Sequence, residues 1–133
     1  MLKTKFCELF GVEYPIVCAG MGNVALANLA AAVSEAGGLG TIAMPGMPPD
    51  AMAAEISAAR KITAKPIVVN QLIPFLRPGI FEMLATQPIS AVTLFWGDPA
   101  EHIPRPPQHL LTIRAVRHQG RPRQKQRPFL SQQ

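Results

Sequence analysis

Four short apolar runs recur along the first hundred residues, separated by segments in which apolar positions have a helical spacing. The runs PIVCAG, GLGTIAM, PIVVN and ISAVTLF begin at residues 15, 38, 66 and 89, so their starts lie 23, 28 and 23 residues apart. Strands that are covered on both faces of a parallel sheet have this continuous apolar character, without alternation of polar residues. The pattern therefore predicts four buried, parallel strands.

The segments between these runs carry helix signals. Apolar residues within 26–33 follow the i, i+3, i+4, i+7 spacing of one helix face, and the glycine pair at 37–38 supplies a stop. A second helix begins at Pro48–Pro49–Asp50, and a third, GIFEMLAT, follows Pro78. Each unit has the length of a βα repeat, so residues 12–96 predict the order βαβαβαβ with right-handed crossovers.

This order is that of the first four units of a TIM barrel, whose eight units need about 250 residues. We therefore expect an α/β fold, with an open four-stranded parallel sheet as the structural alternative. The stretch GDPAEHIPRPPQ at 97–108 begins as the helix of a fifth unit would, because Asp98 suits an N-cap and Pro99 the first helical position. Prolines at 104, 106 and 107 then remove the donors that such a helix requires.

The composition changes at the same place. Residues 1–104 hold six basic and eight acidic side chains, whereas residues 105–133 hold seven basic and none that is acidic. The net charge of +5 therefore arises from the last 29 residues, which are rich in arginine, proline and glutamine. We predict a partial barrel over 1–103 and, over 104–133, an irregular basic tail that is disordered or non-native and does not continue the core.

The cysteine content and the hydropathy of the chain indicate in which cellular compartment the protein resides. Cys7 and Cys18 do not form a disulfide framework, which favours a reducing environment. No apolar run approaches the roughly 18 residues of a membrane span, and the amino terminus lacks a secretory apolar region. We therefore expect a cytoplasmic protein with no membrane partner.

The residues 9–49, LFGVEYPIVCAGMGNVALANLAAAVSEAGGLGTIAMPGMPP, together with KPIVVN and FWGDP, resemble the amino-terminal half of the nitronate monooxygenases. The resemblance covers about residues 6–102 and implies a TIM barrel with FMN at its carboxyl-terminal mouth. It also implies oxidation of alkyl nitronates by O2 to a carbonyl compound and nitrite. Flavin-dependent enoyl-acyl-carrier-protein reductases share the same opening, so enoyl reduction is the alternative reaction.

Residues at the ends of two predicted strands are the candidate cofactor site. Ala19, Gly20, Met21 and Gly22 follow the first strand, and Asn70 ends the third. Small residues let a flat ring lie against the backbone, and an amide both donates and accepts hydrogen bonds. The resemblance makes these the FMN-contacting positions, although the glycines also suit a tight turn and the asparagine a helix cap. We expect no metal site.

Other residues have plainer interpretations. Gly37, Gly38 and Gly40 resemble a phosphate loop, but their position favours the end of a helix and the entry to a buried strand. Cys18 is expected to be a small buried hydrophobic residue. Trp96 ends the fourth strand, where it is either a cover over a ligand or an aromatic plug of the core.

The family's catalytic histidine and phosphate-binding loops have no match in this sequence, so no catalytic residue is assigned. His102, His109 and His118 fit no motif of the family. We therefore expect a truncated or frameshifted, inactive form of a nitronate monooxygenase, with open sheet edges that favour self-association. A non-enzymatic binder of anions or nucleic acid, acting through the run RPRQKQR, is a further alternative, which the absence of interleaved aromatic residues disfavours.

A frameshift predicts a specific DNA sequence. Read in one of the other two frames beyond codon 104, the encoding DNA is expected to continue the βα pattern with further apolar runs at the same spacing. Sequencing the gene tests this expectation. If neither frame contains such runs, the frameshift explanation is wrong.

Overall fold

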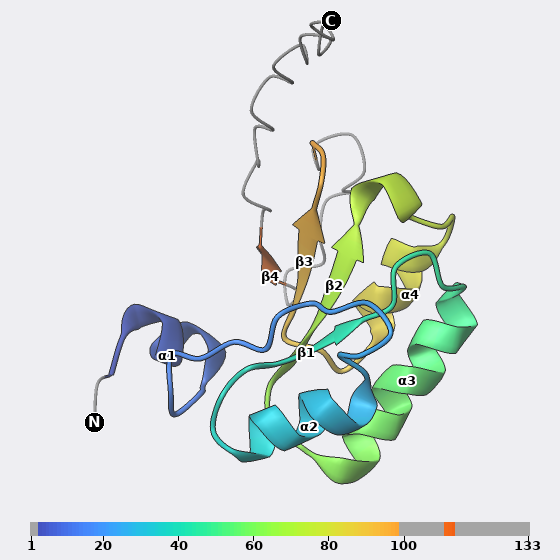
Figure 1. Ribbon diagram of the computed structural model, residues 1–133. Coiled ribbons are helices and arrows are strands. Elements are labelled where there is room, and N and C mark those ends of the chain that lie inside the picture. Colours follow the sequence, from blue (N-terminus) through green and yellow to red (C-terminus); the bar gives the residue numbers. More distant parts are fainter. Residues whose placement is uncertain (1–2, 99–110, 114–133) are drawn as a thin grey trace, which may run out of the picture.

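The computed structural model of the chain describes residues 3–98 and 111–113 (Figure 1). The predicted helix start after Asp98, the three histidines and the predicted tail, except for 111–113, lie outside this part.

Four strands form one sheet in the order β1-β2-β3-β4, and every pair is parallel. The strands are β1 (Gly40–Ala43), β2 (Ile67–Leu72), β3 (Ala91–Phe95) and β4 (Leu111–Ile113). The helices are α1 (Lys5–Phe10), α2 (Ala27–Glu35), α3 (Pro49–Ile62) and α4 (Ile80–Thr86), and a 3-10 turn, η1 (Ile73–Phe75), follows β2.

Three of the four predicted strands are present as β1, β2 and β3, each reached through a predicted helix. The first predicted strand is reduced to one bridge between Val17 and Leu39, so the expectation of a full strand there was wrong. The segment does run parallel to β1, since Leu39 N donates to Ile16 O at 2.8 Å and Cys18 N to Leu39 O at 2.9 Å. Ile16 and Val17 are 62% and 48% exposed, so little packing holds this segment in a longer ladder.

The strand β4 was not predicted. Its residues pair with Ala91–Thr93 of β3 within the segment expected not to continue the core. For Leu111–Ile113 that expectation is corrected, because backbone pairing to β3 adds these residues to the sheet whatever the polarity of their neighbours. The boundary at 103 stays a prediction.

The helices divide unequally between the two faces of the sheet. In Figure 1, α2, α3 and α4 lie along one face and α1 lies on the other side. The helix-covered face forms the larger core, in which Ile42, Val69 and Val92 of the three long strands pack against Met52 of α3 and Leu84 of α4. All five side chains are at most 1% exposed, which explains the continuous apolar runs in the sequence.

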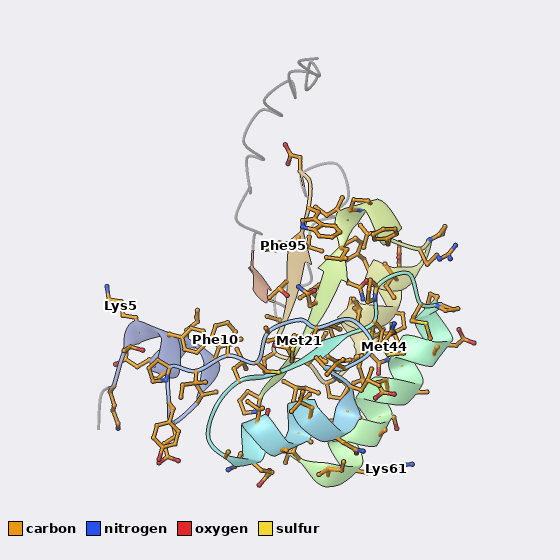
Figure 2. The ribbon with its side chains drawn as sticks, viewed as in Figure 1. Lys5, Phe10, Met21, Met44, Lys61 and Phe95 are labelled. Carbon is orange, nitrogen blue, oxygen red and sulfur yellow. The ribbon has the colours of Figure 1, made fainter. Side chains whose placement is uncertain are left out.

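The opposite face, here called the inner face, is closed at its amino-terminal end by α1. Phe10 packs with Leu39, Val68 and Ala91, and Figure 2 shows its ring on the side of α1 toward the sheet. Sequence analysis did not predict this six-residue helix, which ends at Gly11 with φ +66°. The short helix leaves only the carboxyl-terminal end of the inner face open to a ligand.

The contact between α2 and β1 is closer than any side chain permits. A Cβ on Gly40 would lie 1.9 Å from the carbonyl oxygen of Ala30 in α2. Beside it, the buried hydroxyl of Ser34 accepts from Gly40 N at 3.1 Å and donates to Pro66 O at 2.7 Å. Gly37, with φ +92°, turns the chain out of α2. These glycines therefore end a helix and enter a buried strand, as predicted, rather than form a phosphate loop.

The other units are held by polar contacts between elements. Glu55 Oε1 of α3 accepts from Ala27 N at 2.6 Å and so caps α2, whose N-cap residue Leu26 has no polar side chain. Arg60 donates to Pro88 O and to Lys65 O, which ties the end of α3 to the segments that enter β2 and β3.

The Gly40 contact predicts a large effect of a single methyl group. Gly40→Ala is expected to lower the free energy of unfolding by about 3 kcal/mol, at the upper end of overpacking costs, because the Ala30 carbonyl belongs to helix backbone that cannot rotate away. Urea unfolding followed by circular dichroism measures this.

Gly79→Ala is the matched control, because a Cβ there meets no atom within 4 Å and only the φ of +76° opposes it. We expect that variant to lose about 1 kcal/mol. Equal losses in the two variants would show that α2 is free to move away from β1.

Candidate functional site

The candidate site lies at the carboxyl-terminal edge of the sheet, on the inner face. Ala43, Asn70 and Thr93 occupy one register level of β1, β2 and β3, so their side chains point to the same face. Val68 and Ala91 lie one level deeper, under Phe10, and Leu72 and Phe95 one level further out. The deeper level also holds the buried side chain of Thr41, which pairs with Val68, so the floor under Asn70 is only partly apolar. The site opens toward the ends of the strands.

Asn70 is joined to the neighbouring strand through its side chain. Its Nδ2 donates to Thr93 Oγ1 at 2.9 Å, and the Thr93 hydroxyl donates to Val69 O at the longer distance of 3.5 Å. The Asn70 side chain is only partly buried. The alternative interpretation of Asn70 as a helix cap is wrong, because the residue lies inside β2 and its amide binds β3.

The loop that follows the Val17 bridge brings the other predicted site residues to Asn70. A Cβ on Gly20 would lie 2.6 Å from Asn70 Cγ and 2.7 Å from Asn70 Oδ1, so the Gly20 backbone rests directly against the amide. The loop is anchored to β1, since Asn23 N donates to Ala43 O at 3.3 Å and Ala43 N donates to Ala25 O at 2.8 Å. Contact with Asn70 therefore requires glycine at position 20. From the sequence alone, a tight turn was an equally good reason for this glycine.

The loop also presents polar backbone groups. Within the described part of the chain, no hydrogen bond engages the N–H groups of Ala19, Gly20 and Gly22, and all three residues are exposed. Met21 is 42% exposed and holds the loop in shape, since its carbonyl oxygen accepts from Ala25 N at 2.8 Å. Of the five predicted cofactor residues, Gly20 and Asn70 are thus in contact, and the other three lie in the same loop.

Aromatic side chains border the open end of the inner face. Trp96 is 57% exposed, so the interpretation as a core plug is wrong, and Phe95 at the end of β3 is 38% exposed (Figure 2). Trp96 has φ +61°, a conformation that bulky residues rarely adopt and that functional sites often retain. Cys18 is only half-buried and its thiol donates to Ala19 O at 3.6 Å, so it is not the core residue we expected.

Charged groups with shifted pKa values lie at the other end of the strands. Burial lowers the pKa of Arg60, and a hydrogen bond from the Tyr14 hydroxyl to the Glu13 carboxylate, assisted by the negative charge of Glu13, raises the pKa of Tyr14. A search of residues 3–98 and 111–113 finds no group of three metal-ligating side chains and no helix able to span a membrane. A cavity of about 310 Å³ beside η1 and α4 is lined by none of the predicted site residues.

Sequence reasoning missed Thr93. It is the one polar residue within the apolar run AVTLF, and that irregularity was the available signal. Its significance depends on the register of β2 against β3, which sets it opposite Asn70. The spacing of apolar runs does not determine register to one residue, so the pair was not predictable.

A parallel sheet with helices over one face and a glycine-containing loop at the strand ends defines an α/β protein, a class in which ligands commonly bind at the carboxyl ends of the strands. The family model for nitronate monooxygenase matches residues 3–80. The chain therefore belongs to the nitronate monooxygenase family, as the resemblance indicated.

Known proteins with similar sequences carry different enzyme names. The nitronate monooxygenase of Pseudomonas aeruginosa is 46% identical over 78 residues, which are 59% of this chain and 22% of that protein. A (3aS,4S,5R,7aS)-5-hydroxy-7a-methyl-1-oxo-octahydro-1H-indene-4-carboxyl-CoA dehydrogenase of Mycobacterium tuberculosis is 46% identical over 69 residues, 52% of this chain and 19% of that one. The chain thus spans about a fifth of the length of the curated relatives it matches.

Solved structures share the fold over a larger part of the chain. FabK from Thermotoga maritima has a TM-score of 0.79 at 32% identity, covering 87% of this chain and 38% of FabK. The nitroalkane oxidase from Streptomyces ansochromogenes has a TM-score of 0.60 at 28% identity, covering 71% of this chain and 36% of the oxidase. The names of these relatives denote oxidoreductases that act on different substrates.

The exposure of Trp96 has a direct spectroscopic consequence. Because Trp96 is the single tryptophan of the chain, its fluorescence reports on this edge of the sheet alone. We expect emission close to that of free tryptophan and strong quenching by iodide in the native protein. A blue-shifted emission that iodide does not quench would show that Trp96 is buried in the core.

Proposed function

We propose that the chain binds the ring of FMN at the carboxyl-terminal edge of its sheet, as the ring-binding part of a nitronate monooxygenase. The observation that carries this proposal is the contact of Gly20 with Asn70, which sets three exposed backbone donors beside a polar side chain. Membership of the family and the identity of 46% with a nitronate monooxygenase support the reaction class.

The residues of this edge fit a flavin ring in two respects. The isoalloxazine is flat and carries carbonyl oxygens that accept hydrogen bonds, and the loop offers N–H groups at Ala19, Gly20 and Gly22. The two glycines serve this fit indirectly, because their Cβ positions face Asn70 and Pro45, so the missing Cβ lets the loop backbone lie against these residues and holds its N–H groups beside the amide. The open sheet is, in this proposal, the first part of a (β/α)8 barrel.

Each residue would then have a definite task. The loop would hold the ring by backbone hydrogen bonds, Asn70 would bind its polar edge, and the exposed Trp96 would limit the access of water from the open end. Bound FMN would supply an acceptor for the electron that an alkyl nitronate gives up, and reaction with O2 would yield the carbonyl compound and nitrite.

Turnover of nitronate by these 133 residues alone is not part of the proposal. The family's catalytic histidine and phosphate-binding loops match nothing here, and the described site offers amide and backbone groups but no acid or base. We therefore propose that this chain binds FMN through its ring, weakly, and does not turn nitronates over. The basic tail as an anion binder, and self-association through sheet edges, remain predictions about residues mostly outside the described part.

A second candidate reaction, enoyl reduction, is favoured by one observation. The likeness to FabK, at a TM-score of 0.79, covers more of this chain than the likeness to the nitroalkane oxidase. The two candidates use the same ring-binding edge, so they differ in what exchanges electrons with the flavin rather than in how this chain holds it.

Titration with FMN tests the binding proposal. FMN is expected to quench the Trp96 fluorescence of the wild-type chain saturably, and Gly20→Ala is expected to weaken binding at least about tenfold, because the added Cβ displaces the Asn70 amide. Gly11→Ala, at the amino-terminal end of the inner face, is the matched control and should retain the wild-type affinity, because a Cβ there meets no atom within 4 Å. Equal affinity in all three proteins would place FMN elsewhere or nowhere on this chain.

The same complex separates the two reactions. Under anaerobic conditions, bleaching of the flavin absorbance by an alkyl nitronate supports nitronate oxidation, and bleaching by a nicotinamide hydride donor supports enoyl reduction. In air, we expect no continuous, nitronate-dependent uptake of O2. Sustained uptake would contradict the proposal that this chain does not turn over.

A further inference from the structure

We infer that Thr93 is a positioning residue, which fixes the Asn70 amide so that its carbonyl oxygen, and not its NH2 group, faces the ligand. The ligand group bound there is therefore an N–H donor. This inference rests on the proposed function and deepens it, because it specifies which edge of the flavin ring the site recognises.

The first step is the direction of the hydrogen bonds at Thr93. Its hydroxyl has one hydrogen, which is directed to Val69 O on the neighbouring strand. The oxygen of that hydroxyl is then left to accept, and it accepts from Asn70 Nδ2 at 2.9 Å. An asparagine amide can be turned by 180° without a change of shape, so its orientation is set by such partners alone. Thr93 sets it here.

The second step is the position of the other amide atom. With Nδ2 on the side of Thr93, Oδ1 lies on the side of Gly20, where an added Cβ would come within 2.7 Å of it. No described residue donates to this oxygen. It is also not among the fully buried polar atoms without a partner, which in the described chain are Thr41 Oγ1 and Gln71 Nε2. Asn70 Oδ1 is therefore the amide atom that lies beside the loop and has no donor among the described residues.

The third step is the complementarity with a flavin ring. The pyrimidine edge of oxidised isoalloxazine presents a carbonyl oxygen, an N–H group at N3 and a second carbonyl oxygen. N3–H is the single ring N–H of that oxidation state. The site presents the matching groups, since the N–H groups of the loop donate and Asn70 Oδ1 accepts. With the amide reversed, its NH2 would meet N3–H donor to donor and the match would be lost.

The register of the sheet keeps Thr93 in this role. Asn70 and Thr93 are direct partners between β2 and β3, so the distance between their side chains is fixed by backbone pairing rather than by a mobile loop. In this role Thr93 acts on the ligand through Asn70.

The test combines two variants with two probes. Thr93→Val keeps the shape of the side chain but removes the hydroxyl, and Thr93→Ser keeps the hydroxyl. The probes are FMN and 3-methyl-FMN, in which a methyl group replaces the N3 hydrogen. We expect Thr93→Val to weaken FMN binding about fivefold, the worth of one ordinary hydrogen bond, and Thr93→Ser to bind FMN as the wild type does.

The methylated probe distinguishes positioning from a structural role. Wild-type protein should bind 3-methyl-FMN more weakly than FMN, and Thr93→Val should weaken that binding no further, because the N–H group that Asn70 accepts is gone. Equal loss for both probes in Thr93→Val would overturn the inference and leave Thr93 as a structural residue of the sheet.

The ligand-free protein provides a readout that does not depend on FMN. In NMR spectra of the free chain, the Asn70 side-chain amide resonances should move in Thr93→Val and stay in place in Thr93→Ser. Unchanged resonances in Thr93→Val would refute the hydrogen bond itself. If the resonances behave as expected but neither probe binds, Thr93 does position Asn70 and the proposed function is what fails.

Discussion

The close approach of α2 to β1 is the constraint on which the rest of this structure depends. At Gly40 the strand backbone lies against the Ala30 carbonyl, and Ser34 links the same helix to the entrances of both β1 and β2. This contact fixes the position of β1 along its own axis relative to α2 and to the loop that contains Gly20 and precedes α2. Ala43 at the end of β1 then binds that loop through two backbone hydrogen bonds, at Asn23 and Ala25. The position of Gly20 over Asn70 is therefore a consequence of helix–strand packing at the far end of β1, and the loop needs no side-chain contacts of its own to be placed.

The inner face is ordered in levels from one end of the sheet to the other. Phe10 covers Val68 and Ala91 at the amino-terminal end, so a ligand has no access from there. The next level is polar and holds Asn70 with Thr93, and the outermost is again apolar. A planar molecule with one polar edge matches this order, because its polar edge would meet the middle level while its apolar faces meet the loop and the rim.

Much of this architecture follows from the sequence, and the exceptions have physical causes. Continuous apolar runs predicted β1 to β3, and glycines after a helical stripe predicted the turn from α2 into β1. The first run was predicted as a strand because periodicity registers apolar character alone, but Ile16 and Val17 lack the covering layer that a strand needs. Helix α1 has only six residues, too few for a periodic signal, and forms because Phe10 is buried by distant residues. Asn70 was found from its predicted place at the end of a strand, although β2 continues to Leu72. Thr93 required the register of β2 against β3, which only the folded sheet supplies.

The make-up of the described site also explains why relatives with different reactions share this part of the chain. Backbone N–H groups, one amide and one hydroxyl bind and orient a ring, but they neither hold nor move protons at neutral pH. Groups of this kind do not determine which substrate exchanges electrons with the ring. A nitronate monooxygenase, a dehydrogenase and FabK can therefore each resemble part of this chain although their names differ. In our proposal the Gly20–Asn70–Thr93 arrangement binds the ring, and the choice of reaction depends on what faces the ring from beyond it.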